Sequence, residues 1–301
     1  MTFAKKSELS VIDRNIPVSQ DDTISMLLKE SKRHGRAVPI RRAFVQDTEP
    51  GPVLRQKPGP LPKLLRSPAA FDLYLLIHAI TAGGDFGVTQ RYETWGRATG
   101  ISFATNGSAS AAVSRQLAKL KQLKLISTAA DGRKTRITKR LEDGSEDPYT
   151  VPSGGSRKDI YFKLPFEYWE QGLHNTLSMP AKGMLLIAMS LRKRAFALPQ
   201  NKDFAKWYGI SPATVSRGIA DLKKAGLLLE YMSEAFLTGE SPTGRAERTL
   251  YVLKPPYDIN INKKDRDAEA RAFTPEGILA TALSHAKHLN APRLVLTRPG
   301  A

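Results

Sequence analysis

Cysteine is absent from all 301 residues of the chain. This excludes disulfides, thiolate zinc sites and cysteine nucleophiles, and it suits a reducing compartment. Long apolar runs are also missing, because the best stretch, 71–80, contains Asp72 and His78 and is about half of the roughly 20 residues that a membrane helix needs. No secretory signal pattern follows Met1. We therefore expect a cytoplasmic protein, associated with nucleoid or plasmid, with no membrane partner.

Motifs of catalysis are missing as well. No glycine-rich loop ends in Gly-Lys-Ser or Gly-Lys-Thr, which argues against an ATPase. His285 and His288 share one face of a helix predicted from Pro275 to Leu289, but no carboxylate or third histidine completes a metal site with them. We expect no enzyme activity, no metal and no cofactor.

Acidic residues are in short supply. The chain has 46 Lys and Arg against 29 Asp and Glu, a net charge of +17. Such a charge attracts polyanions, either nucleic acid or an acidic membrane face, and does not choose between them. Residues 1–62 are basic and then proline-rich, which predicts a largely flexible N-terminal arm, in which Asp22–Lys32 could form a short helix. Residues 258–301 form a charged C-terminal tail.

An internal repeat organises the part between these ends. The nine residues from Val113 match the nine from Val215 at six positions. Because further matches follow in the same order, we interpret the two segments as a tandem repeat. The other pairs are Leu65–Ala69 with Leu177–Ala181, Leu75–Ile77 with Leu185–Ile187, Phe86–Gln90 with Phe196–Gln200, and Gly100–Ser102 with Gly209–Ser211.

The third helix of each segment has one apolar face. Val215, Ile219 and Leu222 fall at positions i, i+4 and i+7, so they are predicted to face the core. The equivalent residues of the first segment are Val113, Leu117 and Leu120. The first segment has an extra loop, 103–108, which is either a phosphate-contacting loop or, the reading we favour, a plain insertion.

The order helix, strand, helix, glycine turn, helix and hairpin resembles a winged helix-turn-helix. Residues 202–229 resemble that motif most, and the resemblance extends over 64–253. It implies an α+β fold, mainly α with small β-hairpin wings, with winged domains at 63–166 and 167–257. The return strand of the first wing is expected at Ile160–Lys163. The residues that match the motif are Phe204, Ala205, Gly209, Ile210, Val215, Ile219 and Leu222.

DNA contacts are expected on the outward faces of these helices and on the wings. An arginine can bond both O6 and N7 of guanine, and basic wing tips contact sugar and phosphate. The three tryptophans, Trp95, Trp169 and Trp207, are predicted to pack in the core or between domains rather than to stack on bases. The candidate helix residues are Ser211, Ala213, Thr214, Ser216, Arg217, Lys224, Ser110, Ala111, Ser114 and Arg115. The candidate wing residues are Arg133, Lys134, Arg136, Arg245 and Arg248.

Chains with two winged domains of this size resemble plasmid replication initiators, which implies a plasmid- or phage-type initiator that binds repeated origin sites. One alternative is a transcriptional regulator, a repressor, that uses the same helices. Another is a chromosome-organisation adaptor that binds proteins, against which the charge of +17 argues. The expected partners are double-stranded DNA and, through dimerisation, a second copy of the chain. Which segment reads DNA is open, and the longer first segment is the candidate for dimerisation.

Overall fold

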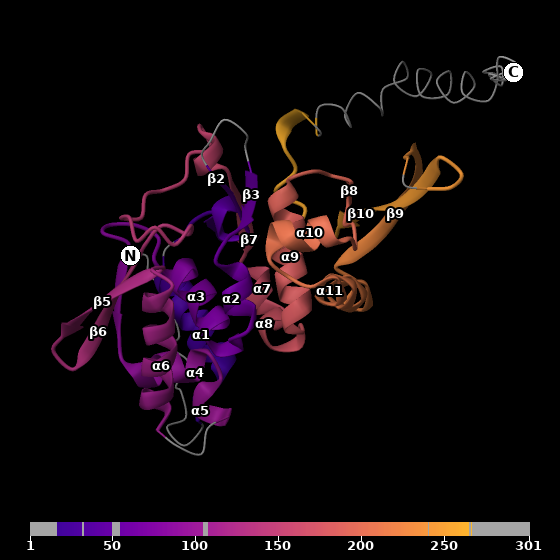
Figure 1. Cartoon of the computed structure of the whole chain (residues 1–301). Coiled ribbons are helices and arrows are strands. Elements are labelled where there is room, and N and C mark those ends of the chain that lie inside the picture. Colours follow the sequence, from indigo (N-terminus) through magenta and orange to yellow (C-terminus); the bar gives the residue numbers. More distant parts are fainter. Residues whose placement is uncertain are drawn as a thin grey trace, which may run out of the picture.

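The computed structural model describes residues 17–31, 33–49, 55–104, 108–239, 241–264 and 266. Within these ranges, helices contribute more of the regular structure than strands do, and small antiparallel sheets complete an α+β fold (Figure 1). Two hairpins, β5–β6 and β9–β10, project from opposite sides in this view. The α+β class expected from the sequence is confirmed.

The chain before residue 62 is folded over its described part, so the prediction of a flexible arm was wrong there. Helix α1 (Gln20–Glu30) starts at the N-cap Ser19 and buries Ile24, Leu27 and Leu28. Their spacing of three and one residues puts them on one helical face. Strand β1 (Ala37–Arg41) then pairs antiparallel with β7 (Tyr161–Pro165). The described part of this N-terminal region therefore belongs to the folded core, and its strand pairs with a strand far along the chain.

Short elements connect this region to the first repeated segment. They are a 3-10 turn η1 (Arg42–Phe44), the paired strands β2 (Gln46–Glu49) and β3 (Arg55–Pro58), and helix α2 (Leu61–Leu65). The first segment follows as α3 (Pro68–Ile80), β4 (Gly87–Gln90), α4 (Tyr92–Ala98), α5 (Ile101–Ala104), α6 (Ala109–Gln122), β5 (Ile126–Asp131) and β6 (Lys134–Lys139). Its sheet has the order β4-β6-β5.

The return strand of the first hairpin is β6, so its prediction at Ile160–Lys163 was wrong. Asp131 pairs with Lys134, and Gly132 turns the chain with a φ of +58°. Because glycine adopts this left-handed conformation readily, two residues close the hairpin. Most of the predicted strand belongs to β7 instead, which β1 requires as a partner.

The second segment repeats this order of elements. After η2 (Arg157–Asp159), α7 (Glu167–Glu170) and α8 (Leu173–Thr176) come α9 (Met179–Leu191), β8 (Phe196–Ala197), α10 (Lys202–Tyr208), α11 (Pro212–Lys224), β9 (Leu228–Leu237) and β10 (Arg245–Leu253). Its sheet order, β8-β10-β9, corresponds to that of the first segment. The predicted hairpin is confirmed, with Leu237 opposite Arg245.

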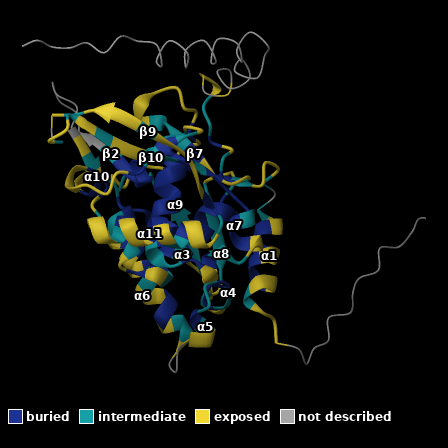
Figure 2. Ribbon diagram, turned by 90° about the vertical axis from the view of Figure 1, so that its right-hand side faces the viewer, coloured by how far each residue is buried: buried dark blue, intermediate teal, exposed yellow. Residues whose placement is uncertain are grey.

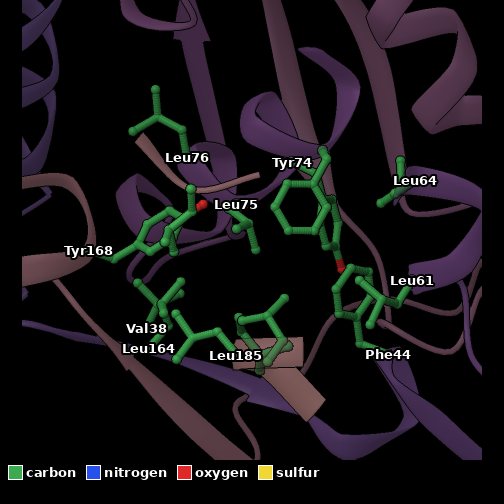
Figure 3. Packing of buried hydrophobic residues seen from close by; sticks show 14 of the residues in the cluster. Val38, Phe44, Leu61, Leu64, Tyr74, Leu75, Leu76, Leu164, Tyr168 and Leu185 are labelled. Carbon is green, nitrogen blue, oxygen red and sulfur yellow. The ribbon is translucent and has the colours of Figure 1, made fainter. Parts of the chain in front are cut away.

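One hydrophobic core runs through both segments. Helices α3 and α9 are buried on nearly all sides, and Figure 3 shows Leu75 and Leu76 of α3 with Leu185 of α9 in this packing. Between the two helices, Lys182 Nζ lies 2.7 Å from Asp72 Oδ1. The domain boundaries at 62, 166 and 257 stay predictions.

The tryptophans behave differently from one another. Trp95 and Trp169 are 0% and 4% exposed, as predicted for core residues. Trp207 is 42% exposed, so its core assignment was wrong. It lies on α10 beside the face that buries Phe204, Ala205 and Tyr208.

The chain after β10 is held by side-chain hydrogen bonds. Asn260 Oδ1 accepts from Lys163 N at 2.6 Å, and its Nδ2 donates to Lys163 O at 3.0 Å. The predicted tail helix from Pro275 to Leu289, with His285 and His288, lies outside the described residues.

A buried lysine lies at the carboxyl end of α3. Lys139 is 2% exposed, and its Nζ donates to Thr81 O at 2.8 Å. The same atom lies 3.8 Å from the centre of the Tyr149 ring. The pKa of Lys139 is lowered from 10.5 to about 7, mainly because the side chain is buried and secondly because the charge of Arg33 is near.

Lys139 should therefore make stability depend on pH. Above pH 7 the folded protein has released this proton, whereas the unfolded chain holds it up to about pH 10, so the free energy of unfolding rises between these values. We expect Lys139→Met to remove this rise. Relative to the parent, the substitution should increase the free energy of unfolding most at pH 6. Urea unfolding at pH 6, 8 and 10 measures it, with exposed Lys134→Met in the same strand as control. Parallel pH profiles for the parent and Lys139→Met would contradict this account.

Candidate nucleic-acid interface

The turn between α10 and α11 is built from local sequence. Gly209 follows α10 with a φ of +65°, a left-handed conformation that suits the glycine turn predicted here. Ser211 is the N-cap of α11, and its Oγ accepts a hydrogen bond from Thr214 N at 3.1 Å. Pro212 then occupies the first turn, where it loses no hydrogen bond.

The inner face of α11 is fixed against α9. Val215, Ile219 and Leu222 are buried as predicted. Gly218 allows a close approach, because a Cβ there would lie 2.4 Å from Met184 Cγ and 2.5 Å from Pro180 O. The hydroxyl of Ser178, which caps α9, also bonds to Asp221 of α11. The orientation of the outer face of α11 follows from these contacts.

The outer face carries most of the predicted residues. Ala213, Arg217 and Lys224 are exposed, as their helical spacing predicts. Figure 2 shows exposed stretches along α11. Ser216 is also exposed, and its Oγ bonds to Gln200. Thr214 is half-buried, and the Ser211 hydroxyl is engaged in the cap.

Helix α6 has a similar arrangement. Ser108 caps it by accepting from Ala111 N at 3.3 Å, and Ala111, Ser114 and Arg115 are exposed. Ser110 is half-buried and donates to Glu93 at 2.9 Å, so it is tied to α4. Residues 105–107 of the extra loop lie outside the described part.

The contact of α6 with α3 parallels that of α11 with α9. Lys119 Nζ donates to Ser67 Oγ at 2.6 Å. Ser67 is the N-cap residue of α3, and Lys119 aligns with Asp221 in the repeat. In each segment the N-cap serine of the buried helix, α3 or α9, therefore contacts the aligned position of the third helix, α6 or α11.

The basic residues of the hairpins fall into two groups. Arg133, Lys134 and Arg245 are exposed at the hairpin ends. Arg136 instead bonds to Asp85 and lowers the pKa of that carboxyl. Arg248 lies 2.8 Å from Glu234 Oε2 and over the ring of Phe236. Sequence reasoning missed both pairings, which depend on neighbouring strands and loops.

Helix α10 adds basic residues that the sequence analysis left out. Lys202 and Lys206 are exposed, beside the exposed Trp207. In helix-turn-helix proteins, the helix before the recognition helix crosses the DNA backbone. Lys202 and Lys206 lie away from the apolar residues Phe204 and Ala205 in the helical pattern, and this position could have identified them from the sequence.

Comparison with known proteins identifies part of this region. Residues 174–228 match the model of a family described as a helix-turn-helix domain. The match covers α9, α10 and α11. No curated protein and no solved structure matches the chain. No helix in the described ranges is long and apolar enough to cross a membrane. The prediction of a helix-turn-helix is thus confirmed for the second segment.

The approach of α11 to α9 can be tested at Gly218. Gly218→Val would place new atoms against the backbone of Pro180, and overpacking of this kind costs about 1–3 kcal/mol. We expect a loss of about that size in the free energy of unfolding, measured by urea denaturation. The control is Ala220→Val, which adds a β-branched side chain at an exposed position of the same helix and should cost less than about 1 kcal/mol. Equal losses would mean that the close approach does not support α11.

Proposed function

We propose that the chain is a sequence-specific double-stranded DNA-binding protein with α11 as a recognition helix. The main support is the exposed row of Ala213, Ser216 and Arg217 on a helix whose other face is buried. A small residue followed by arginine one turn later suits entry into a major groove. The helix-turn-helix match and the charge of +17 support this assignment.

We further propose that the first segment is a second winged helix-turn-helix, with α6 as its recognition helix. The support is the shared order of elements, the shared strand order and the parallel Ser67–Lys119 and Ser178–Asp221 contacts. Asp72 and Lys182 come from the same region of α3 and α9 and contact each other. Contact between equivalent positions is typical of units related by a two-fold axis.

A chain with two such units would act as a covalent pseudo-dimer. Each unit presents one helix, and two successive major grooves on one side of a duplex lie one helical turn, about 34 Å, apart. Of the roles open to such a protein, we propose a plasmid- or phage-type replication initiator that binds repeated origin sites. The support is the resemblance in architecture, together with the net positive charge.

Two arginines should have different effects on DNA binding. The preferred site would first be selected from a pool of random duplexes. Arg217→Ala should then weaken binding to that site by about 1–3 kcal/mol and relax the preference at one base pair. Arg245→Ala, at a hairpin end, should weaken specific and random DNA alike and reduce the salt dependence. Titrations by fluorescence anisotropy measure both. An equal loss on both DNAs for Arg217→Ala would refute base reading by this residue.

The initiator role makes a separate prediction. A genome-wide binding map should show several tandem sites beside the gene for this chain, and a plasmid carrying those sites should fail to replicate when the gene is deleted. Scattered promoter sites with normal replication would instead identify a transcriptional regulator and overturn the initiator role.

A further inference from the structure

The β9–β10 hairpin exposes an apolar face. Leu229 and Met232 of β9 are 47% and 50% exposed, and Phe236 is 37% exposed. Met232 is paired with Leu250 and Leu229 with Val252, which places these side chains on one side of the sheet. We term this side, made of Leu229, Met232, Phe236, Leu250 and Val252, the outer face. Tyr251 points to the other side and is buried in the core.

The chemistry of the outer face does not suit DNA. Leucine, methionine and valine offer nothing to a phosphate backbone, and Glu234 lies among them, paired with Arg248. Figure 2 shows β9 exposed over most of its length. Because contiguous exposed apolar residues mark protein-binding surfaces, an apolar protein segment is the occupant that this face fits.

The chain contains such a segment after the described residues. In 274–289, Ile278, Ala282 and Ala286 recur at every fourth position, a spacing that predicts a helix with one apolar stripe. Leu279, Leu283 and Leu289 widen the same stripe, whereas Ser284 and His288 fall opposite. Thr274 and Pro275 are suited to the N-cap and the first turn. We propose that residues 274–289 bind as an amphipathic helix to the outer face of the hairpin.

The connection between the hairpin and residues 274–289 allows this contact within one chain. After β10, Lys254 N donates to Leu227 O at 2.9 Å, which keeps the chain near the base of the hairpin. The stretch from Arg266 to Ile278 can span up to about 40 Å. Strand β9, with ten residues, is about 33 Å long, so this stretch, when extended, is longer than the strand.

A bound C-terminal helix would also protect an edge. Strand β9 pairs only with β10 within the described chain, because the sheet order is β8-β10-β9. Exposed apolar edge strands associate with other chains unless they are covered. The helix would cover the apolar side chains beside this edge and so restrict the approach of a second copy to it.

Disulfide trapping in the full-length chain tests this contact, because the natural sequence has no cysteine. The test variant is Met232→Cys/Ala282→Cys, with one substitution on the outer face and one in the apolar stripe. One control moves the strand substitution to the opposite side, Ser233→Cys/Ala282→Cys. The other moves the helix substitution to the polar side, Met232→Cys/Ser284→Cys. Phe236→Cys/Ala286→Cys is a second test variant, in case the first does not fold.

Mild oxidation at low protein concentration, without DNA, should give an intramolecular disulfide in the test variants at least about ten times faster than in the controls, because a bound segment has a high effective concentration. Equal rates in test and control variants, or no disulfide in either test variant, would overturn the proposal. Disulfide-linked dimers in place of the intramolecular product would assign the face to a second copy instead. Since no DNA is present, the result does not depend on the proposed function.

Discussion

The burial of α3 and α9 on nearly all sides is the constraint on which the rest of the structure depends. Neither helix has a polar face to offer to water, so each must be covered by other elements. Helix α6 packs on α3 and α11 packs on α9, and the N-cap serine of each central helix contacts its covering helix. The outer faces of α6 and α11 are what this packing leaves for a partner.

The two segments differ in how closely the covering helix approaches the buried central helix. In α11, Gly218 permits close contact with the start of α9. At the matching position of α6 stands Gln116, which is half-buried and too large for the same approach. Helix α11 therefore has the more extensive contact with its central helix. This difference, with the helix-turn-helix match, makes the second segment the stronger candidate for reading DNA.

Features fixed by neighbouring residues could be predicted from the sequence. The buried row Val215, Ile219 and Leu222, the cap at Ser211 and the turn at Gly209 follow from helical spacing and backbone preference, and the structure shows them. Hairpin β9–β10 was predictable for the same reason.

Features that depend on distant residues could not be predicted. Strand β1 is stabilised by β7, more than a hundred positions later, and its own sequence gives no sign of that partner. The same holds for Lys182, whose aliphatic surroundings predict a core residue but not its ion pair with Asp72. At the candidate site, the ion pair of Arg136 with Asp85 depends on a loop far away in sequence.

The central claim is that two recognition helices of one chain read one duplex, and guanine methylation protection tests it most directly. On its selected site, the protein should protect two groups of major-groove guanines about one helical turn apart. Arg217→Ala should abolish protection in one group and leave the other. A single protected group of guanines, or protection only of adenine N3 in the minor groove, would contradict the account.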